Sequence, residues 1–267
     1  MMSGIDTRAA VGEDAILGEN VSVGPFAIIE DGAVIGDGCQ IAPHAHLTQW
    51  ARLGNDVRVF TGAVIGSNPQ DLKFAGEDTT MEVGDRTVIR EYATLNRGTN
   101  ESGSSTVGED CLLMAYSHVA HDCHIGNRVI MANSVNMAGH VTIEDWVIIG
   151  GMVPIHQFVH LGQHSFIGGG WRVPQDVPPY TLVAGDPLEY RGVNAIGLRR
   201  RGFSNECINA IKHAYKIIYR SNLNVSQAME SIKNEVEMTP EIKAIVDFVE
   251  NDSERGIVGR AKKASDF

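Results

Sequence analysis

Three histidines of this chain recur at intervals close to 18 residues. They are His121, His140 and His156, and Asp122 directly follows the first of them. Imidazole is the side chain best suited to proton transfer near neutral pH, and a neighbouring carboxylate can orient it. If the chain repeats every 18 residues, the three rings run up one edge of the molecule. The spacing therefore favours a histidine base on this edge, against the alternative of ordinary polar surface residues.

Glycines lie close to these histidines in the sequence. Gly139 precedes His140, and glycine pairs and triplets follow at 150–151 and 168–170. A backbone N–H near His121 could stabilise the oxyanion of an acyl transfer, although most of these glycines suit tight corners equally well. The sequence has no G-x-S-x-G nucleophile motif, phosphate-binding loop or dinucleotide fingerprint. These observations favour direct transfer, in which an acceptor hydroxyl or amine attacks a bound thioester.

A six-residue repeat is the element that must position these groups. Large aliphatic residues return at every sixth position over 5–65, 83–95 and 107–173, as in Ile29, Ile35 and Ile41. A small residue, such as Ala33 or Ala45, follows four positions later. Neither an α-helix nor a two-sided strand has this period, whereas three hexads make one turn of a parallel β-helix. We therefore predict an all-β hexapeptide solenoid.

The repeat is interrupted twice and then ends. Residues 71–82 and 101–106 leave the pattern but keep its phase, so we expect loops that carry binding groups or merely pad the solenoid. We assign 1–190 to the β-helix and 191–267 to a small α-helical C-terminal domain, with 181–198 as a connector. Helices are expected from about Ser204, over 225–236 and after Thr239-Pro240, with frayed residues at 255–267.

Composition narrows the function further. The net charge of −11 argues against nucleic-acid binding, and neither a hydrophobic leader nor a membrane span is visible. The four cysteines lack metal or redox spacing; we expect Cys39, Cys111 and Cys123 to be buried in a cytoplasmic protein. The stretch 191–220 is nevertheless basic, which suits an anionic partner or else a solvated helix face. Its cations are Arg191, Arg199, Arg200, Arg201, Lys212, Lys216 and Arg220.

Several longer segments resemble one known family. They are NPQDLKFAGE (68–77), IREYATLNRGT (89–99), SHVAHDCHIGNRVIMAN (117–133), AGHVTIEDWVIIGGMVPIHQF (138–158), QDVPPY (175–180) and GVNAIGLRRRGF (192–203). Over essentially its whole length the chain resembles the acyl-carrier-protein-dependent UDP-N-acetylglucosamine O-acyltransferases. The resemblance implies a left-handed β-helix, a homotrimer and no metal or cofactor. It also implies transfer of an (R)-3-hydroxyacyl group to the sugar 3-hydroxyl, the first step of lipid A biosynthesis.

The resemblance also implies roles for individual residues. His121 would be the general base, Asp122 its partner and Gly139 the oxyanion donor. The substrate-binding residues would be Gln70, Asp71, Lys73, His118, His140, His156, Gln157, Asn194, Arg200 and Arg201, with the last two also facing the carrier protein. Gly169 falls where the family measures acyl length and leaves the groove open for a longer chain, although Phe166 could narrow it.

Two positions depart from the family pattern, and other functions stay open. Asn96 replaces a frequent histidine, and Ile196 replaces a frequent glutamate that contributes a nucleotide contact. The acceptor could instead be a 3-amino UDP-sugar, or the reaction N-acylation of a related UDP-sugar. From other classes, three histidines could bind zinc in a hydratase of the γ-carbonic-anhydrase type, or the chain could be a non-catalytic scaffold.

Overall fold

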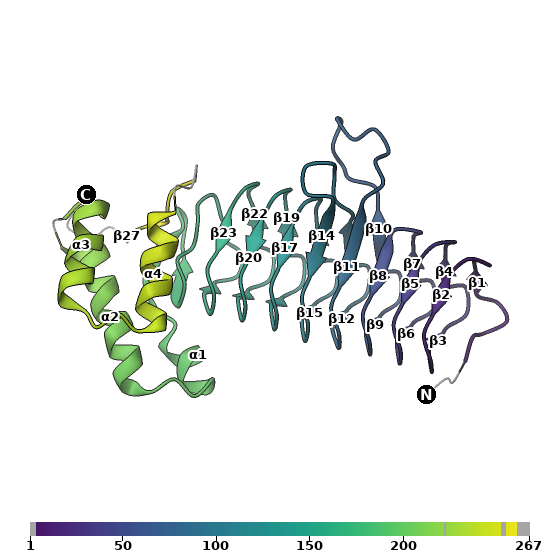
Figure 1. Cartoon of the computed structure of the whole chain (residues 1–267), viewed down its shortest axis with the longest axis horizontal. Helices are drawn as coiled ribbons and strands as arrows, with labels where there is room; N and C mark the ends of the chain where they lie inside the picture. Colours follow the sequence, from purple (N-terminus) through teal and green to yellow (C-terminus); the bar gives the residue numbers. More distant parts are fainter. Residues whose placement is uncertain (1–3, 222, 252–254, 261–267) are drawn as a thin grey trace.

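The chain coils into a three-sided prism of short strands that carries helices at one end (Figure 1). The computed structural model describes residues 4–221, 223–251 and 255–260. Strands of equal position in successive coils pair in parallel and form three sheets. The six-residue repeat therefore builds one flat side per hexad, as the sequence predicts.

Sheet 1 contains β1 (Ala10–Val11), β4 (Ile28–Ile29), β7 (His46–Leu47), β10 (Val64–Ser67), β13 (Thr94–Asn96), β16 (His118–Val119), β19 (Asn136–Met137) and β22 (Pro154–Ile155). Sheet 2 contains β2 (Ile16–Leu17), β5 (Val34–Ile35), β8 (Ala51–Leu53), β11 (Thr80–Val83), β14 (Ser104–Val107), β17 (His124–Ile125), β20 (Thr142–Ile143) and β23 (His160–Leu161). Sheet 3 begins with β3 (Ser22–Val23), β6 (Gln40–Ile41), β9 (Arg58–Val59), β12 (Val88–Ile89), β15 (Leu112–Leu113), β18 (Ile130–Met131), β21 (Ile148–Ile149) and β24 (Phe166–Ile167).

The strand register shows where the two insertions lie. Paired residues are normally 18 apart, as in Ala10↔Ile28, but Val64 pairs with Thr94 and Met81 with Ser105. The insertions thus have the predicted lengths of twelve and six residues. Their positions differ, because β11 and β14 occupy the ends of the predicted segments. The loops themselves are 68–79 and 97–103. Both loops connect sheet 1 to sheet 2 and project from the same edge of the prism (Figure 1). The hexad phase defines an insertion's length and not its position.

The interior is filled by the two regular hexad positions. Large aliphatic side chains such as Ile29 and Leu113 are fully buried, together with the small residues that precede each strand. Cys39, Cys111 and Cys123 occupy small positions and are buried free thiols, as predicted. Burial raises the pKa of Cys39 and of Cys111 to about 11, so these cysteines are packing residues rather than nucleophiles.

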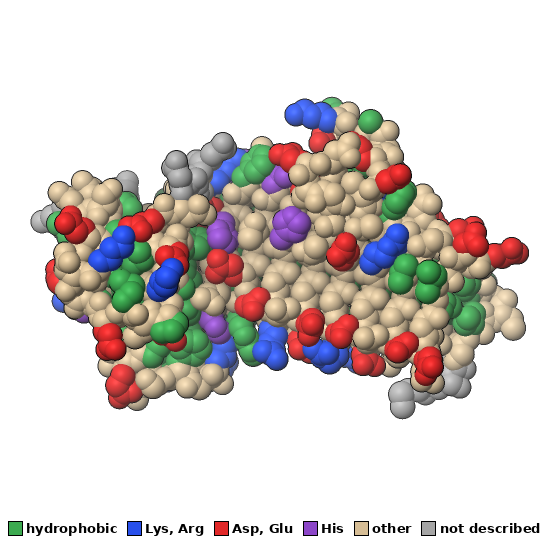
Figure 2. Space-filling model, viewed as in Figure 1, with side chains coloured by type: hydrophobic (Ala, Val, Ile, Leu, Met, Phe, Trp, Pro, Cys, Tyr) green, Lys and Arg blue, Asp and Glu red, His purple; other side chains and the backbone are tan. Residues whose placement is uncertain are grey.

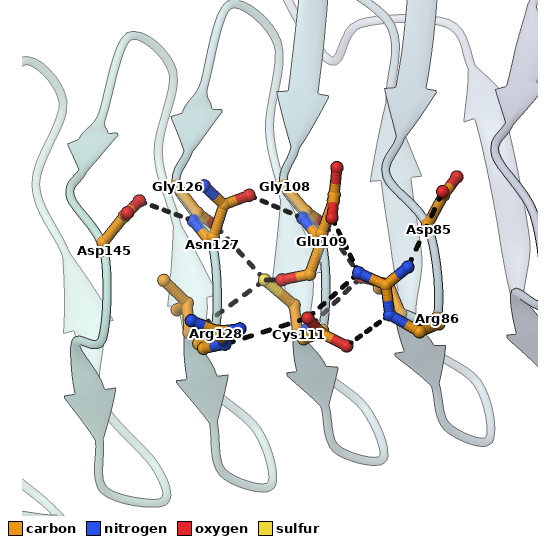
Figure 3. A network of polar contacts seen from close by, with 12 residues as sticks. Asp85, Arg86, Gly108, Glu109, Cys111, Gly126, Asn127, Arg128 and Asp145 are labelled. Carbon is orange, nitrogen blue, oxygen red and sulfur yellow. Dashed lines mark hydrogen bonds and ion pairs between the residues drawn. The ribbon is translucent and has the colours of Figure 1, made fainter. Parts of the chain in front are cut away.

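The corners between sheets 2 and 3 are held by a ladder of side-chain acceptors (Figure 3). The Oδ1 atom of Asn127 accepts from the Glu109 N–H at 2.9 Å, and Asp145 Oδ1 accepts from the Asn127 N–H at 2.7 Å. Arg86, paired with Asp110 at 2.7 Å, lies beside the ladder. Mixed red and blue side chains follow the lower edge of the prism in Figure 2. The N–H groups of Glu109 and Asn127 thus each receive an acceptor from the next coil.

Four helices follow the solenoid: α1 (Ala195–Arg200), α2 (Asn205–Arg220), α3 (Val225–Glu235) and α4 (Pro240–Glu250). Ser204, Asn224 and Thr239 cap the last three, and each side-chain oxygen accepts a hydrogen bond from a backbone N–H in the first turn. The predicted helix starts are confirmed for these three. None of the described helices has the length and apolar character needed to cross a bilayer.

The expected connector is more structured than the sequence indicated. The segment 181–198 holds an antiparallel hairpin of β25 (Thr181–Ala184) and β26 (Glu189–Val193), followed by α1. The expectation of a frayed end is wrong for β27 (Gly259–Arg260), which pairs with β26; residues 261–267 lie outside the described residues. All three strands extend sheet 3, so β26 crosses the assigned boundary at 190/191. The hairpin adds strands to sheet 3 without a six-residue repeat, so the periodicity of the sequence could not predict it.

Candidate active site

The edge between sheets 1 and 2 carries the predicted histidines. His140 lies one coil after Asp122 with the same left-handed backbone, and its N–H donates to the carbonyl of His121 at 3.1 Å. The rings of His121 and His140 meet edge to face with centroids 5.1 Å apart. The next ring is Phe158, stacked on His140 at 4.6 Å. His156 is exposed on the following coil, and its Nδ1 lies 3.2 Å from the carbonyl oxygen of Gln157.

His121 and Asp122 form a hydrogen-bonded pair. Nδ1 of His121 donates to Asp122 Oδ2 at 2.8 Å, which leaves Nε2 as the acceptor of a proton. The imidazole is 14% exposed and the carboxylate 1% exposed. Burial by itself raises the pKa of Asp122, but hydrogen bonds from Ser102, His121 and Thr99 outweigh it and lower the pKa to about 2. The ionised carboxylate therefore fixes the tautomer of a partly accessible base.

Gly139 lies against the ring of His121. A Cβ at this position would be 2.6 Å from His121 Cε1 and 2.7 Å from Nε2, so only glycine leaves room for the imidazole. Among the described residues, no acceptor is paired with the Gly139 N–H. The arrangement thus sets an unused backbone donor beside a histidine base, which is what the stabilisation of a developing oxyanion requires.

The loop 97–103 supplies groups that sequence reasoning missed. Thr99 donates to Asp122 through its N–H and its hydroxyl, both at 2.8 Å, and the Ser102 hydroxyl donates to Oδ1. Glu101 Oε2 lies 3.6 Å from His140 Nε2. Nothing in the hexad pattern predicts these contacts, because the insertion interrupts the periodicity that places other residues.

The loop 68–79 carries Gln70, Asp71 and Lys73 away from the prism. Asp71 Oδ1 accepts from the Lys73 N–H at 3.0 Å, and the side chains of Gln70 and Lys73 are exposed. The base of the loop is held by Arg97, whose guanidinium lies between the rings of Trp50 and Phe74, at 4.5 and 4.8 Å from their centroids. It also donates to Asn68 Oδ1 and to the carbonyl of Glu77, so it holds the two flanks of the loop together.

Asn96 and His118 support the same edge from sheet 1. Asn96, at the first departure from the family pattern, is buried and donates to Ser67 Oγ at 2.8 Å and to the carbonyl of Asn68 at 3.0 Å. His118 Nδ1 lies 2.8 Å from Thr94 Oγ1, and burial lowers the pKa of His118. Asn96 thus ties the start of the loop 68–79 to sheet 1, whereas His118 pairs with the neighbouring strand β13 within that sheet.

The residues expected at the nucleotide lie on another edge, between sheets 2 and 3. Asn194 caps α1 and donates to the carbonyl of His164 at 3.0 Å. Arg201 lies 3.1 Å from His164 Nδ1 and donates to the carbonyl of Trp146 at 2.9 Å. Arg200 and Ile196 are exposed on α1. Within one chain, these residues are not brought together with His121.

Phe166 and Gly169 lie on a third part of the prism. Phe166 is half-buried in β24, and Gly169 is exposed at the following corner between sheets 3 and 1. A Cβ at Gly169 would lie 3.1 Å from the carbonyl oxygen of Gly151. The predicted base, nucleotide residues and acyl-length residues therefore occupy three different edges of a single chain.

One group of described residues could in principle hold a metal ion. Ligand atoms of His121, Asp122 and His140 lie within 4.8 Å of one another. However, both oxygens of Asp122 already accept hydrogen bonds from Thr99, and Oδ2 also accepts from His121. A metal on these atoms would displace the bond that orients the imidazole. The donor set is therefore better suited to proton transfer than to coordination.

Known proteins share this fold and sequence over nearly the whole chain. The family described as "Udp N-acetylglucosamine O-acyltransferase; Domain 2" matches residues 176–258, and the bacterial transferase hexapeptide repeat matches 14–49 and 104–139. The acyl-[acyl-carrier-protein]–UDP-N-acetylglucosamine O-acyltransferase of Stenotrophomonas maltophilia K279a is 45% identical over 249 residues, covering 92% of this chain and 95% of that protein. The same-named protein of Pseudomonas entomophila L48 is 43% identical over 257 residues, covering 96% and 99%.

Solved structures agree with these relatives. The UDP-N-acetylglucosamine acyltransferase of Bacteroides fragilis is 47% identical, with a TM-score of 0.93 and coverage of 95% of this chain and 99% of that chain. The enzyme of Francisella novicida is 35% identical, with a TM-score of 0.92 and coverage of 98% and 96%. Together with the hexapeptide match, they confirm a left-handed parallel β-helix with a small helical C-terminal part. The chain belongs to the acyl-[acyl-carrier-protein]–UDP-N-acetylglucosamine O-acyltransferase family.

Proposed function

We propose that this enzyme transfers an (R)-3-hydroxyacyl chain from acyl carrier protein to the 3-hydroxyl of UDP-N-acetylglucosamine, the first step of lipid A biosynthesis. The names of the relatives support the substrates. The observation that carries the chemistry is the bond from His121 Nδ1 to a buried, ionised Asp122, beside a Gly139 N–H that no described residue accepts from. This arrangement supplies a base and an oxyanion donor without a covalent intermediate.

In the proposed mechanism, Nε2 of His121 takes the proton of the sugar 3-hydroxyl as its oxygen attacks the thioester carbonyl. Negative charge moves to the carbonyl oxygen, where the Gly139 N–H stabilises it. The tetrahedral intermediate then collapses, the C–S bond breaks, and the imidazolium returns its proton to the departing sulfur. Asp122 stabilises the imidazolium throughout, and no cofactor or metal takes part.

A homotrimer with shared sites would reconcile the positions of the remaining residues. Asn194, Arg200 and Arg201 lie on a different edge from His121, and Phe166 and Gly169 lie on a third part of the prism. Copies packed side by side would bring one edge of each chain against a different edge of its neighbour. In that assembly Gln70, Asp71, Lys73, His118, His140, His156 and Gln157 would bind the sugar, diphosphate and acyl groups.

The basic surface of the helical part suits the carrier protein. Arg200 is exposed on α1, and Lys212, Lys216 and Arg220 are exposed on α2, so they present positive charge on an acidic molecule. Carrier proteins are acidic, and complementary charge mainly accelerates and orients association. We assign acyl-carrier-protein docking to this surface and the reaction to the cytoplasm, where free cysteines persist.

Acyl-chain length is proposed to depend on Gly169. A glycine there leaves the corner without a side chain, and an added Cβ would press within 3.1 Å of the Gly151 carbonyl oxygen. We therefore expect preference for a longer 3-hydroxyacyl chain, with Phe166 forming part of the groove wall.

A transfer assay tests the function. Purified protein is incubated with UDP-N-acetylglucosamine and 3-hydroxyacyl carrier proteins of several lengths, and products are identified by mass spectrometry. A mono-acylated UDP-sugar is the expected product, and His121→Ala should lower turnover by about 10²–10⁴-fold while the fold is retained. Product only with the 3-amino sugar would change the acceptor, and no product with either sugar would overturn the proposal.

A further inference from the structure

The loop 97–103 reaches the catalytic pair through Asp122. Four donors converge on this one carboxylate: Oδ1 accepts from the Thr99 N–H and the Ser102 hydroxyl, and Oδ2 accepts from the Thr99 hydroxyl and His121 Nδ1. The carboxylate is 1% exposed, so water supplies almost none of its hydrogen bonds. The loop therefore replaces the solvation of the charge that orients His121.

The Ser102 hydroxyl has two acceptors within reach and can donate to only one of them. Its hydroxyl has a single proton, and a second acceptor, the carbonyl oxygen of Ser104, lies 2.8 Å away. An ionised carboxylate is the stronger acceptor, so the proton belongs on Asp122 Oδ1. Oδ1 thus accepts two hydrogen bonds from the loop, and Oδ2 is shared by the Thr99 hydroxyl and the imidazole of His121.

We propose that Ser102 is a positioning residue for the His121–Asp122 pair, acting through Asp122 Oδ1. This inference rests on the proposed acyl transfer. Ser102 holds the carboxylate plane so that Oδ2 faces His121 Nδ1, which keeps Nε2 aimed at the acceptor hydroxyl. The six-residue insertion is therefore part of the catalytic apparatus rather than padding, although it contributes no group to the reacting atoms.

The contact predicts a specific kinetic signature for Ser102→Ala. Ser102 is exposed and touches Asp122 rather than the proposed substrate positions, so its loss should spare binding. We expect kcat to fall about tenfold, in the range seen when the partner of an orienting group is removed, while KM for UDP-N-acetylglucosamine stays within about twofold. Ser102→Thr keeps the hydroxyl and should recover most of the loss.

The experiment compares wild type, Ser102→Ala, Ser102→Thr and Asn100→Ala in the transfer assay, together with thermal unfolding. Asn100 is an exposed neighbour in the same loop and controls for general loosening of the loop. A loss of kcat in Ser102→Ala alone, with an unchanged melting temperature, supports the inference. Unchanged kcat in Ser102→Ala, or an equal loss in Asn100→Ala or Ser102→Thr, overturns it. Failure of the wild type to transfer would instead overturn the proposed function.

Discussion

At the scale of single residues, the site depends on the fit between His121 and the backbone of the next coil. The imidazole of His121 lies so close to Gly139 that a Cβ added to the glycine would be 2.6 Å from the ring. The ring is thus confined by Gly139 on one side and by the Asp122 carboxylate at Nδ1. Confinement of this kind determines whether the base is aligned when the acceptor binds.

Gly139→Ala tests that confinement. The methyl group must push the imidazole away, because the Gly139 backbone is held by a hydrogen bond from the Phe158 N–H to its carbonyl oxygen at 3.2 Å. We expect kcat to fall at least tenfold, since misplacement by about 1 Å can cost about 100-fold. Gly259→Ala is the control, because nothing lies within 4 Å of its added Cβ. Wild-type kcat in Gly139→Ala would show that His121 is not confined by this contact.

The sequence predicted some of these contacts and could not predict others. His121 and His140 are expected on one edge because an 18-residue coil puts residues 121 and 139 at the same position, and their rings indeed lie 5.1 Å apart. Phe158 lies a further 18 residues after His140, so the repeat places it on the same edge, but its stacking on His140 was not predicted. Thr99 and Ser102 were beyond prediction because they lie in a loop, where chain conformation and not period determines which side chain reaches Asp122.

At the scale of elements, strands of two residues need help to keep their register. Each strand contributes few ladder hydrogen bonds, so the corners must contribute as well. Asn127 belongs to the ladder in Figure 3: its side chain accepts from the Glu109 N–H of the preceding coil, and its N–H donates to Asp145 of the following coil. Asn127 thus ties its coil to the two that flank it.

Asn127→Ala tests the ladder. The substitution removes the acceptor of the Glu109 N–H, and we expect a loss of about 1 kcal/mol because the corner is exposed and water partly replaces the bond. Thermal or denaturant unfolding measures it. Asn127→Asp keeps an acceptor oxygen and should remain close to wild type. Equal destabilisation by both substitutions would assign the effect to the amide group rather than to the ladder.

At the scale of the whole molecule, the helical part is joined to the prism by shared strands and by an aromatic stack. β26 and β27 extend sheet 3, which explains why the boundary predicted from the end of the hexads falls inside an element. The ring of His164 is stacked between Trp146 and Tyr180, at 6.0 and 5.6 Å, and Phe203 meets its edge at 5.0 Å. Together with Arg201, these rings fasten the helices to the last coils.

This junction makes stability depend on pH. Burial, reinforced by the positive charge of Arg201, lowers the pKa of His164 from 6.5 to about 4. The folded junction therefore holds neutral histidine, while the unfolded chain takes up a proton as the pH falls below 6.5. The stabilisation is complete above that pH and is lost progressively towards pH 4; at pH 5 the loss is about 2 kcal/mol.

Denaturant unfolding of the wild type and of His164→Gln between pH 7.5 and 5 measures this loss. Glutamine cannot titrate, so the variant should be less stable at pH 7.5 but should show a smaller decline towards pH 5. The Asp122 carboxylate does not obscure the comparison, because its pKa of about 2 places its own contribution at lower pH. Parallel pH profiles for the two proteins would mean that the docking of the helices is held by the rings and shared strands alone, without a contribution from the neutral state of His164.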